Sequence, residues 1–359
     1  MKLYKLFTPG PIDVPDDVLK ETAKPLIYHR EDKFKTFLLD ITTALRKVMF
    51  TNNEIYFLTS SGTGGMETAL ANILSSTDTP VVASCGKFGE RWVELCRNYR
   101  VMPMMVEAEY GRTVPPEAVE EKLKKQGMPT VVFATLTETS TGVVNDIKAY
   151  GDICRRHDSL LVVDGVAGLG ADYCPQDEWN IDILIGASQK AFMAPPGIAF
   201  ISVSARAHDK IKHSDLPKYY FHLDAYEKFL EKGQTPWTPA ITVLYGLHKG
   251  LNKIIKEGVK AMFKRHAKIG DYARKRIRKM GLEIFPERPS NALTVMKMPP
   301  DINSTDIIKE IKEKYYLLFA NGQGEMRGKI LRIGHMGNYT VAKVGAAIDI
   351  LERVYKKWS

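Results

Sequence analysis

The amino-acid sequence predicts an α/β protein: a large domain with a mostly parallel sheet of seven strands, followed by a smaller α+β domain. From Glu54 onward, short apolar runs alternate with amphipathic segments of helical length. The apolar runs are unbroken rather than alternating, which is typical of parallel strands covered on both faces. The expected strands are 55–58, 80–83, 101–106, 130–134, 160–163, 183–185 and 198–203.

A second change of pattern predicts where the domains divide. After 234–239, which is rich in proline and threonine, a helical region runs from Ile241 to about Lys279 with an interruption near Gly258. We therefore expect an arm at 1–18, a large domain at 19–256 and a small domain at 257–359. The dense prolines and glycine of the arm predict that it has no regular structure. In the small domain we expect strands at 283–285, 293–297, 317–320 and 330–333, and helices at 305–314 and 341–355.

Composition and charge exclude several classes of protein. The chain has 359 residues and a net charge of +9, and its excess of basic residues is spread over amphipathic helices such as 117–125 and 264–279. This distribution predicts solvated helix faces and no nucleic-acid partner. No stretch approaches the roughly 20 apolar residues of a membrane span, and the first residues do not form a signal peptide.

The four cysteines form neither a CxxC pair nor the spacing of a metal site; they are Cys85, Cys96, Cys154 and Cys174. They are interpreted as reduced thiols of a cytoplasmic protein that binds no metal.

Lys190 lies in a loop of small and apolar residues between two expected strands, in Ser188-Gln-Lys-Ala-Phe-Met-Ala-Pro-Pro-Gly197. These surroundings predict that its side chain is enclosed, and burial lowers the pKa of an amine. A lysine that can lose its proton can attack a carbonyl carbon and form a Schiff base. Taken alone, the same stretch also fits a loop lysine that makes one hydrogen bond.

Two further expected strands are followed by polar residues that could bind a ligand. The strand at 55–58 runs into Thr59-Ser-Ser-Gly-Thr-Gly-Gly65 and then a helix, where free N–H groups and the helix dipole favour an anion. The strand at 160–163 ends on Asp164, whose buried carboxylate requires a cation or hydrogen-bond donors. A glycine-rich turn with a capping hydroxyl, and an Asx turn at Asp164, remain open as simpler interpretations. An aldehyde, a ring nitrogen and a phosphate on one molecule would satisfy all three places, and pyridoxal phosphate (PLP) carries these groups.

The chain resembles the class V aminotransferases, which have fold type I and depend on PLP, and within them the alanine–glyoxylate and serine–pyruvate group. The resemblance covers nearly the whole chain and rests on motifs in a fixed order. They are Thr8-Pro-Gly-Pro, Ser61-Gly-Thr, Gly86-Lys-Phe-Gly-Glu-Arg, Glu138-Thr-Ser-Thr-Gly142, Val163-Asp-Gly-Val, Ser188-Gln-Lys-Ala, Ala194-Pro-Pro-Gly and Leu331-Arg-Ile-Gly.

The resemblance implies a role for each matched residue. Lys190 would bind the cofactor aldehyde and move the proton, and Asp164 would pair with the ring nitrogen. The remaining cofactor contacts would be Ser61, Gly62, Thr63, Phe88, Thr139, Val166, Gln189 and Thr238. Thr238 would reach the phosphate of a second subunit, so a homodimer is expected. Arg332 would hold the α-carboxylate of the substrate, and Gly10, His29 and Arg30 complete the expected substrate contacts.

The implied reaction is a ping-pong transamination in which a small L-amino acid, alanine or serine, gives its amino group to glyoxylate or pyruvate. An ω-acidic amino acid, aspartate or phosphoserine, is the alternative donor, because His29-Arg30 is similar to a pair in phosphoserine aminotransferases. Cysteine desulfurase is disfavoured, because Gln189 rather than His precedes the lysine. The alternative from another class is a nucleotide- or nucleic-acid-binding α/β protein without enzymatic activity. A purified protein that is colourless would support that alternative.

Overall fold

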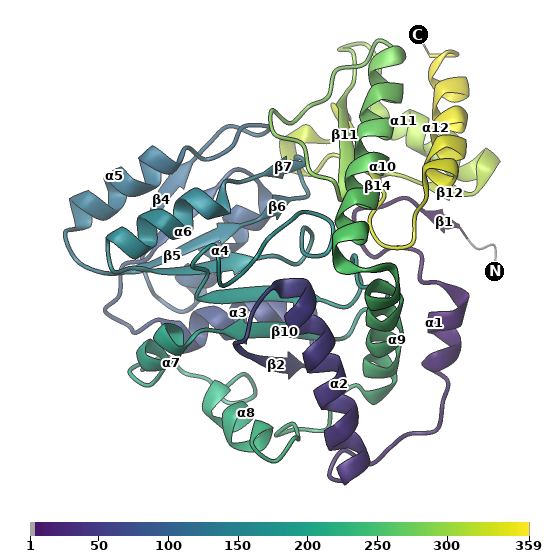
Figure 1. Ribbon diagram of the computed structural model, residues 1–359. Helices are drawn as coiled ribbons and strands as arrows, with labels where there is room; N and C mark the ends of the chain where they lie inside the picture. Colours follow the sequence, from purple (N-terminus) through teal and green to yellow (C-terminus); the bar gives the residue numbers. More distant parts are fainter. Residues whose placement is uncertain (1–3, 359) are drawn as a thin grey trace.

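The computed structural model describes residues 4–358 and contains a seven-stranded sheet between two layers of helices (Figure 1). The strand order is β2-β10-β9-β8-β5-β3-β4. Only β10 runs antiparallel to its neighbours, so the prediction of a mostly parallel seven-stranded sheet is confirmed. The strands are β2 (Glu54–Leu58), β3 (Val81–Ser84), β4 (Met104–Glu107), β5 (Val131–Thr135), β8 (Leu160–Asp164), β9 (Ile183–Ala187) and β10 (Ala199–Val203).

The sheet separates two hydrophobic cores, because successive side chains of a strand point to opposite faces. In β2, Ile55 and Phe57 join one core, and Tyr56 and Leu58 join the other. Five of the strands are buried along their whole length, as their unbroken apolar runs predict; they are β3, β5, β8, β9 and β10.

Helices from different parts of the chain cover each face. The face of Tyr56 is covered by α3 (Gly62–Ile73), α4 (Lys87–Asn98), α7 (Ala205–Ile211) and α8 (Leu223–Leu230). The opposite face is covered by α2 (Asp32–Met49), α5 (Pro116–Gln126), α6 (Ile147–Arg156) and α9 (Ile241–Glu257).

The C-terminal part of the chain forms an antiparallel three-stranded sheet in the order β11-β14-β13, accompanied by three helices. Its elements are β11 (Leu293–Lys297), β13 (Ala320–Asn321), β14 (Ile330–Gly334), α10 (Val259–Lys279), α11 (Ser304–Tyr315), α12 (Val341–Tyr355) and the 3-10 turn η1 (Gly324–Met326). Gly258 separates α9 from α10 with a φ of 92°, which confirms the expected interruption. The boundary between the domains at 256–257 stays a prediction.

Three expected strands differ substantially from those observed, and the others agree to within two residues at each end. The strand expected at 101–106 begins only at Met104, because Pro103 has no N–H with which to join the ladder. The expected strand at 283–285 is reduced to one bridge between Ile284 and Met296. The expected strand at 317–320 divides into β12 (Leu317–Leu318) and β13, which belong to different sheets.

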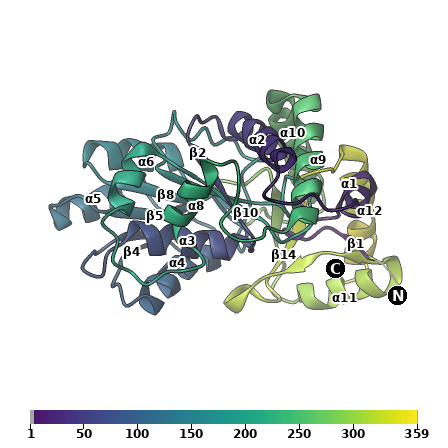
Figure 2. The same ribbon diagram turned by 90° about the horizontal axis from the view of Figure 1, so that it is seen from below.

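The prediction that the N-terminal arm has no regular structure is wrong. Strand β1 (Lys5–Leu6) pairs in parallel with β12, and helix α1 (Asp16–Glu21) begins directly after Pro15. The prolines do not prevent this pairing, because they begin at Pro9 and leave the N–H groups of Lys5 and Phe7 free to donate. Figure 2 shows β1 beside the small domain, near the C-terminus of the chain.

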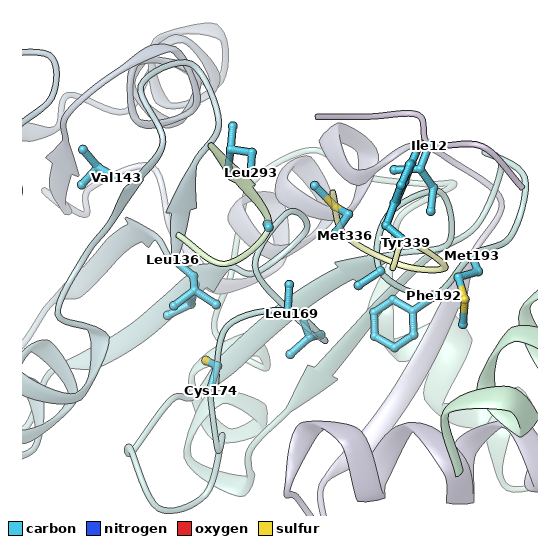
Figure 3. Packing of buried hydrophobic residues seen from close by; sticks show 14 of the residues in the cluster. Ile12, Leu136, Val143, Leu169, Cys174, Phe192, Met193, Leu293, Met336 and Tyr339 are labelled. Carbon is cyan, nitrogen blue, oxygen red and sulfur yellow. The ribbon is translucent and has the colours of Figure 1, made fainter. Parts of the chain in front are cut away.

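The arm then continues toward the loop that contains Lys190. Figure 3 shows Ile12 among Tyr339 and Met336 of the small domain, with Phe192 and Met193 of the Lys190 loop nearby. A Cβ atom on Gly337 would lie 2.4 Å from Ile12 Cδ1 and 3.2 Å from Met193 Cγ, so these three segments meet at close range.

Among the helices of residues 4–358, none has the length and apolar character needed to cross a membrane.

Candidate active site

One cavity of ≈ 240 Å³ opens beyond the carboxyl ends of β2, β8 and β9, where ligands bind in sheets of this kind. The predicted site residues that line it are Gly10, Ser61, Gly62, Thr63, Phe88, Thr139, Asp164, Val166, Gln189 and Lys190. The structure therefore brings together segments from the arm and from five separate parts of the large domain.

Lys190 is buried on the loop after β9, with 8% of its surface exposed. Its Nζ donates a hydrogen bond to the carbonyl oxygen of Pro9 at 2.7 Å. The pKa of Lys190 is lowered to about 8, mainly by burial; the negative charge of Asp164 opposes this shift, and the positive charges of Arg332 and Arg91 add to it. The loop is held in place because Ser188 Oγ donates to the carbonyl of Pro195 at 2.6 Å.

Asp164 is the last residue of β8 and is also buried. Its Oδ1 accepts a hydrogen bond from the backbone N–H of Val166 at 2.9 Å. Burial raises the pKa of Asp164 to about 6, although Lys190 and Arg91 lower it in part. The Asx turn left open above is therefore present, and it holds the carboxylate at the cavity wall.

The glycine-rich turn leads directly into α3, with Ser61 as the N-terminal cap residue. The Ser61 side chain makes no capping hydrogen bond, so the first N–H groups of the helix have no partner from that hydroxyl. A Cβ atom on Gly62 would lie 2.6 Å from Val166 Cγ2, which leaves room at this position only for glycine. The N-terminal end of α3 thus packs against the Asp164 loop, and it has the free N–H groups that an anion-binding site requires.

Phe88 is held by groups that the sequence analysis left without a role. Glu138 is fully buried and accepts hydrogen bonds from the backbone N–H groups of Phe88 at 2.8 Å and Gly89 at 3.1 Å. Arg91 stacks over the Phe88 ring at 4.6 Å from its centroid and also lines the cavity, as does Thr137. Glu138 and Arg91 both stand in the quoted motifs, and their place there was the signal that could have found them.

Arg332 lies on β14 behind the cavity and is buried, with 6% of its surface exposed. Its Nη1 donates to the carbonyl of Thr139 at 2.7 Å, and its Nε donates to the carbonyl of Asn321 at 2.8 Å. These bonds join the small domain to the cavity wall and fix the guanidinium plane.

Besides Arg332, three further predicted residues do not line the cavity of their own chain. Thr238 is exposed in the loop after Trp237. Arg30 donates to the carbonyls of Thr235 at 2.7 Å and Pro236 at 3.0 Å, so it holds that same loop. His29 lies next to Arg30 and contacts Phe34 edge to face. Their expected roles at the cofactor and substrate stay predictions.

The residues of the cavity fit pyridoxal phosphate. The Oε1 atom of Gln189 is buried without a hydrogen-bond partner, which is costly unless a ligand donates to it or orders a water there. Gly10 leaves space beside the amine, because a Cβ atom there would lie 2.1 Å from Lys190 Nζ. An amine with a lowered pKa, a carboxylate and a free helix N-terminus match the aldehyde, the ring nitrogen and the phosphate.

The fold and this cavity define a PLP-dependent enzyme of the aminotransferase class. The family model described as Aminotransferase class-V matches residues 21–323, and the chain belongs to that family. It is 33% identical to the L-aspartate–glyoxylate aminotransferase of Paracoccus denitrificans, over 97% of this chain and 90% of that protein. It is 30% identical to the serine–glyoxylate aminotransferase of Hyphomicrobium methylovorum, over 98% and 89%. The structure of alanine–glyoxylate aminotransferase from Nostoc sp. superimposes with a TM-score of 0.95 at 26% identity, covering 99% of this chain and 96% of that one.

Proposed function

We propose that this aminotransferase moves the amino group of a small L-amino acid, alanine or serine, to glyoxylate or pyruvate in a ping-pong reaction. The observation that carries the proposal is the convergence of Lys190, Asp164 and the N-terminus of α3 on one cavity, with Arg332 bonded to its wall. Glyoxylate is favoured as acceptor because it appears in the names of all three similar proteins.

Each residue has a distinct task in this proposal. The bound cofactor supplies a conjugated ring that accepts electrons from the substrate carbon. Lys190 Nζ takes the proton from that carbon, since its lowered pKa leaves part of the amine neutral near pH 8. Asp164 stays ionised above about pH 6 and holds the proton of the ring nitrogen. Arg332 donates to the α-carboxylate, for which a planar guanidinium is suited.

A homodimer completes the proposed site. Thr238 is exposed on a loop held by Arg30, with the stacked rings of Tyr220 and Trp237 beside it. Tyr219 packs against the same Trp237 and has 78% of its surface exposed. Exposed aromatic side chains of this kind are typical of interfaces, which supports contact between this surface and the cofactor phosphate of a second copy.

An aminotransferase for aspartate is the second candidate, favoured by the name of the relative from Paracoccus. A second carboxylate on the substrate would need a second cation. In the part of the chain that the structure describes, the only cationic side chains that line the cavity are Lys190 and Arg91. The protomer therefore offers no cation other than these two along the cavity wall for an ω-carboxylate, which makes the smaller donors the first choice.

A half-reaction screen tests the proposed function. The protein with bound cofactor is mixed with one amino acid at a time, without an oxo acid, and the absorbance band of the lysine-bound cofactor is followed. We expect alanine and serine to remove the band faster than aspartate or phosphoserine, and glyoxylate or pyruvate to restore it. Faster reaction with aspartate or phosphoserine would establish the alternative, and no reaction with any amino acid would overturn the proposal.

A further inference from the structure

Arg91 has a cationic side chain that lines the cavity, and the proposed reaction as described above gives it no role. It projects from the second turn of α4 and is partly buried. Its Nη1 donates a hydrogen bond to Thr63 Oγ1 at 3.1 Å, and its guanidinium lies over the Phe88 ring at 4.6 Å. Arg91 therefore touches both the glycine-rich turn before α3 and the aromatic side chain that is expected to contact the cofactor.

The charge balance of the cavity gives Arg91 a function. A phosphate monoester carries about −1.5 to −2 charges near neutral pH, and Asp164 adds another negative charge to the same wall. The end of α3 supplies only about half a positive charge. Lys190 is committed to the aldehyde, and Arg332 does not line the cavity and is assigned to the substrate α-carboxylate. Of the cationic side chains that line the cavity within residues 4–358, Arg91 is the one left to balance the phosphate.

The hydrogen bond from Arg91 to Thr63 also directs the hydroxyl hydrogen of Thr63 toward the expected position of the phosphate. A hydroxyl has one hydrogen to donate and lone pairs that accept. Because Thr63 Oγ1 accepts from Arg91, its own hydrogen is free to point to an anion at the start of α3. A nearby guanidinium strengthens such a bond, since it polarises the hydroxyl.

We propose that Arg91 binds the cofactor phosphate, as its countercharge within the protomer, and orients the Thr63 hydroxyl toward it. The inference rests on the proposed placement of the cofactor at Lys190. This role can be distinguished from a purely structural one, in which Arg91 only supports Phe88. A countercharge would affect the binding of the phosphate group alone, whereas support of the Phe88 ring would affect the binding of any pyridoxal compound.

The test compares two aldehydes that differ only in the phosphate. Full-length wild type, Arg91→Met and Arg97→Met are freed of cofactor, and each is titrated with PLP and with pyridoxal. Arg97 is the matched control, since it lies on the same helix but is exposed. Circular dichroism and the thermal midpoint check that each variant is folded. Lysine-bound aldehyde is reduced with borohydride and counted by mass spectrometry, so that weak binding of pyridoxal is also measured.

For Arg91→Met we expect the dissociation constant of PLP to rise by about tenfold or more, the usual loss when a charge-assisted hydrogen bond is removed. The value for pyridoxal should change less than about threefold, and Arg97→Met should match wild type for both. Unchanged PLP binding in Arg91→Met, or an equal loss for the two aldehydes, would overturn the role of Arg91 while leaving the proposed function standing. A wild-type protein that carries neither aldehyde on Lys190 would instead refute the proposed active site itself, and this inference with it.

Discussion

Lys190 Nζ lies 2.7 Å from the carbonyl oxygen of Pro9, although 181 positions separate the two residues in the chain. The contact exists because the N-terminal arm is fixed to the small domain by strand pairing and by aromatic packing. Its first strand pairs with β12, and Phe7 packs against Phe319 and Tyr339 of the small domain. The arm thus forms one wall of the proposed active site and supplies a hydrogen-bond acceptor for the amine of Lys190.

The pKa values at the cavity predict how cofactor attachment depends on pH. The amine of Lys190 must be neutral to attack, and its pKa is lowered to about 8. The rate at which the cofactor attaches to Lys190 in the cofactor-free protein should therefore rise with pH up to about 8 and then level off. For an ordinary lysine, the rate of attachment would continue to rise up to the usual pKa near 10.5.

The variant Asp164→Asn tests the cause of that pH dependence. Asp164 raises the pKa of Lys190 through its negative charge, so removing the charge should move the bend in the rate profile to lower pH. Stopped-flow absorbance measures the profile for both proteins. A bend that stays in place or moves to higher pH would show that the two groups do not interact as described.

Arg332 is expected to act on substrate and not on the cofactor. Arg332→Lys keeps the charge but loses the planar pair of donors, so KM for both the amino acid and the oxo acid should rise by about tenfold or more. Steady-state kinetics and a PLP titration measure the two effects separately. A weakened affinity for PLP with unchanged KM would place Arg332 at the cofactor instead.

Gly62 and Val166 offer a test of the packing between the glycine-rich turn before α3 and the Asp164 loop. A methyl group on Gly62 would lie 2.6 Å from Val166 Cγ2, and such overpacking costs roughly 1–3 kcal/mol. Gly62→Ala should lower the free energy of unfolding by that amount, and the double variant Gly62→Ala/Val166→Ala should recover part of the loss. Urea denaturation of wild type, the two single variants Gly62→Ala and Val166→Ala, and the double variant completes the cycle, and independent, additive losses would contradict the contact.

Thr238 tests the proposed dimer through subunit mixing. The chain has a mass of 40.4 kDa, and light scattering should give twice that value. Thr238→Ala should weaken PLP binding several-fold, because one hydrogen bond contributes about 1 kcal/mol. In a mixed dimer with Lys190→Ala, one of the two sites has both native residues, so that site should recover wild-type affinity. No recovery on mixing would contradict a contact across the interface.

The functional residues at the strand ends could be predicted from the sequence, because each one lies beside an apolar run that is itself recognisable as a strand. Asp164 follows an unbroken apolar run, and Lys190 stands in a loop without other charges, so both were recognisable before the fold was known. Arg91 was overlooked although it ends the quoted motif Gly86-Lys-Phe-Gly-Glu-Arg, because an arginine on an amphipathic helix looks the same whether it faces solvent or a cavity. The pairing of β1 with β12 was missed for another reason. It joins the two ends of the chain, and two-residue strands carry no periodicity that could reveal it.

The most direct measurement is to reduce the purified protein with borohydride and to map the lysine that carries the pyridoxyl group. Lys190 is predicted to carry the group on the peptide that contains Ser188-Gln-Lys-Ala, and Lys190→Ala should show no label elsewhere in the chain. Label on another lysine, or an unlabelled Lys190 in a protein that still transaminates, would contradict the proposed active site.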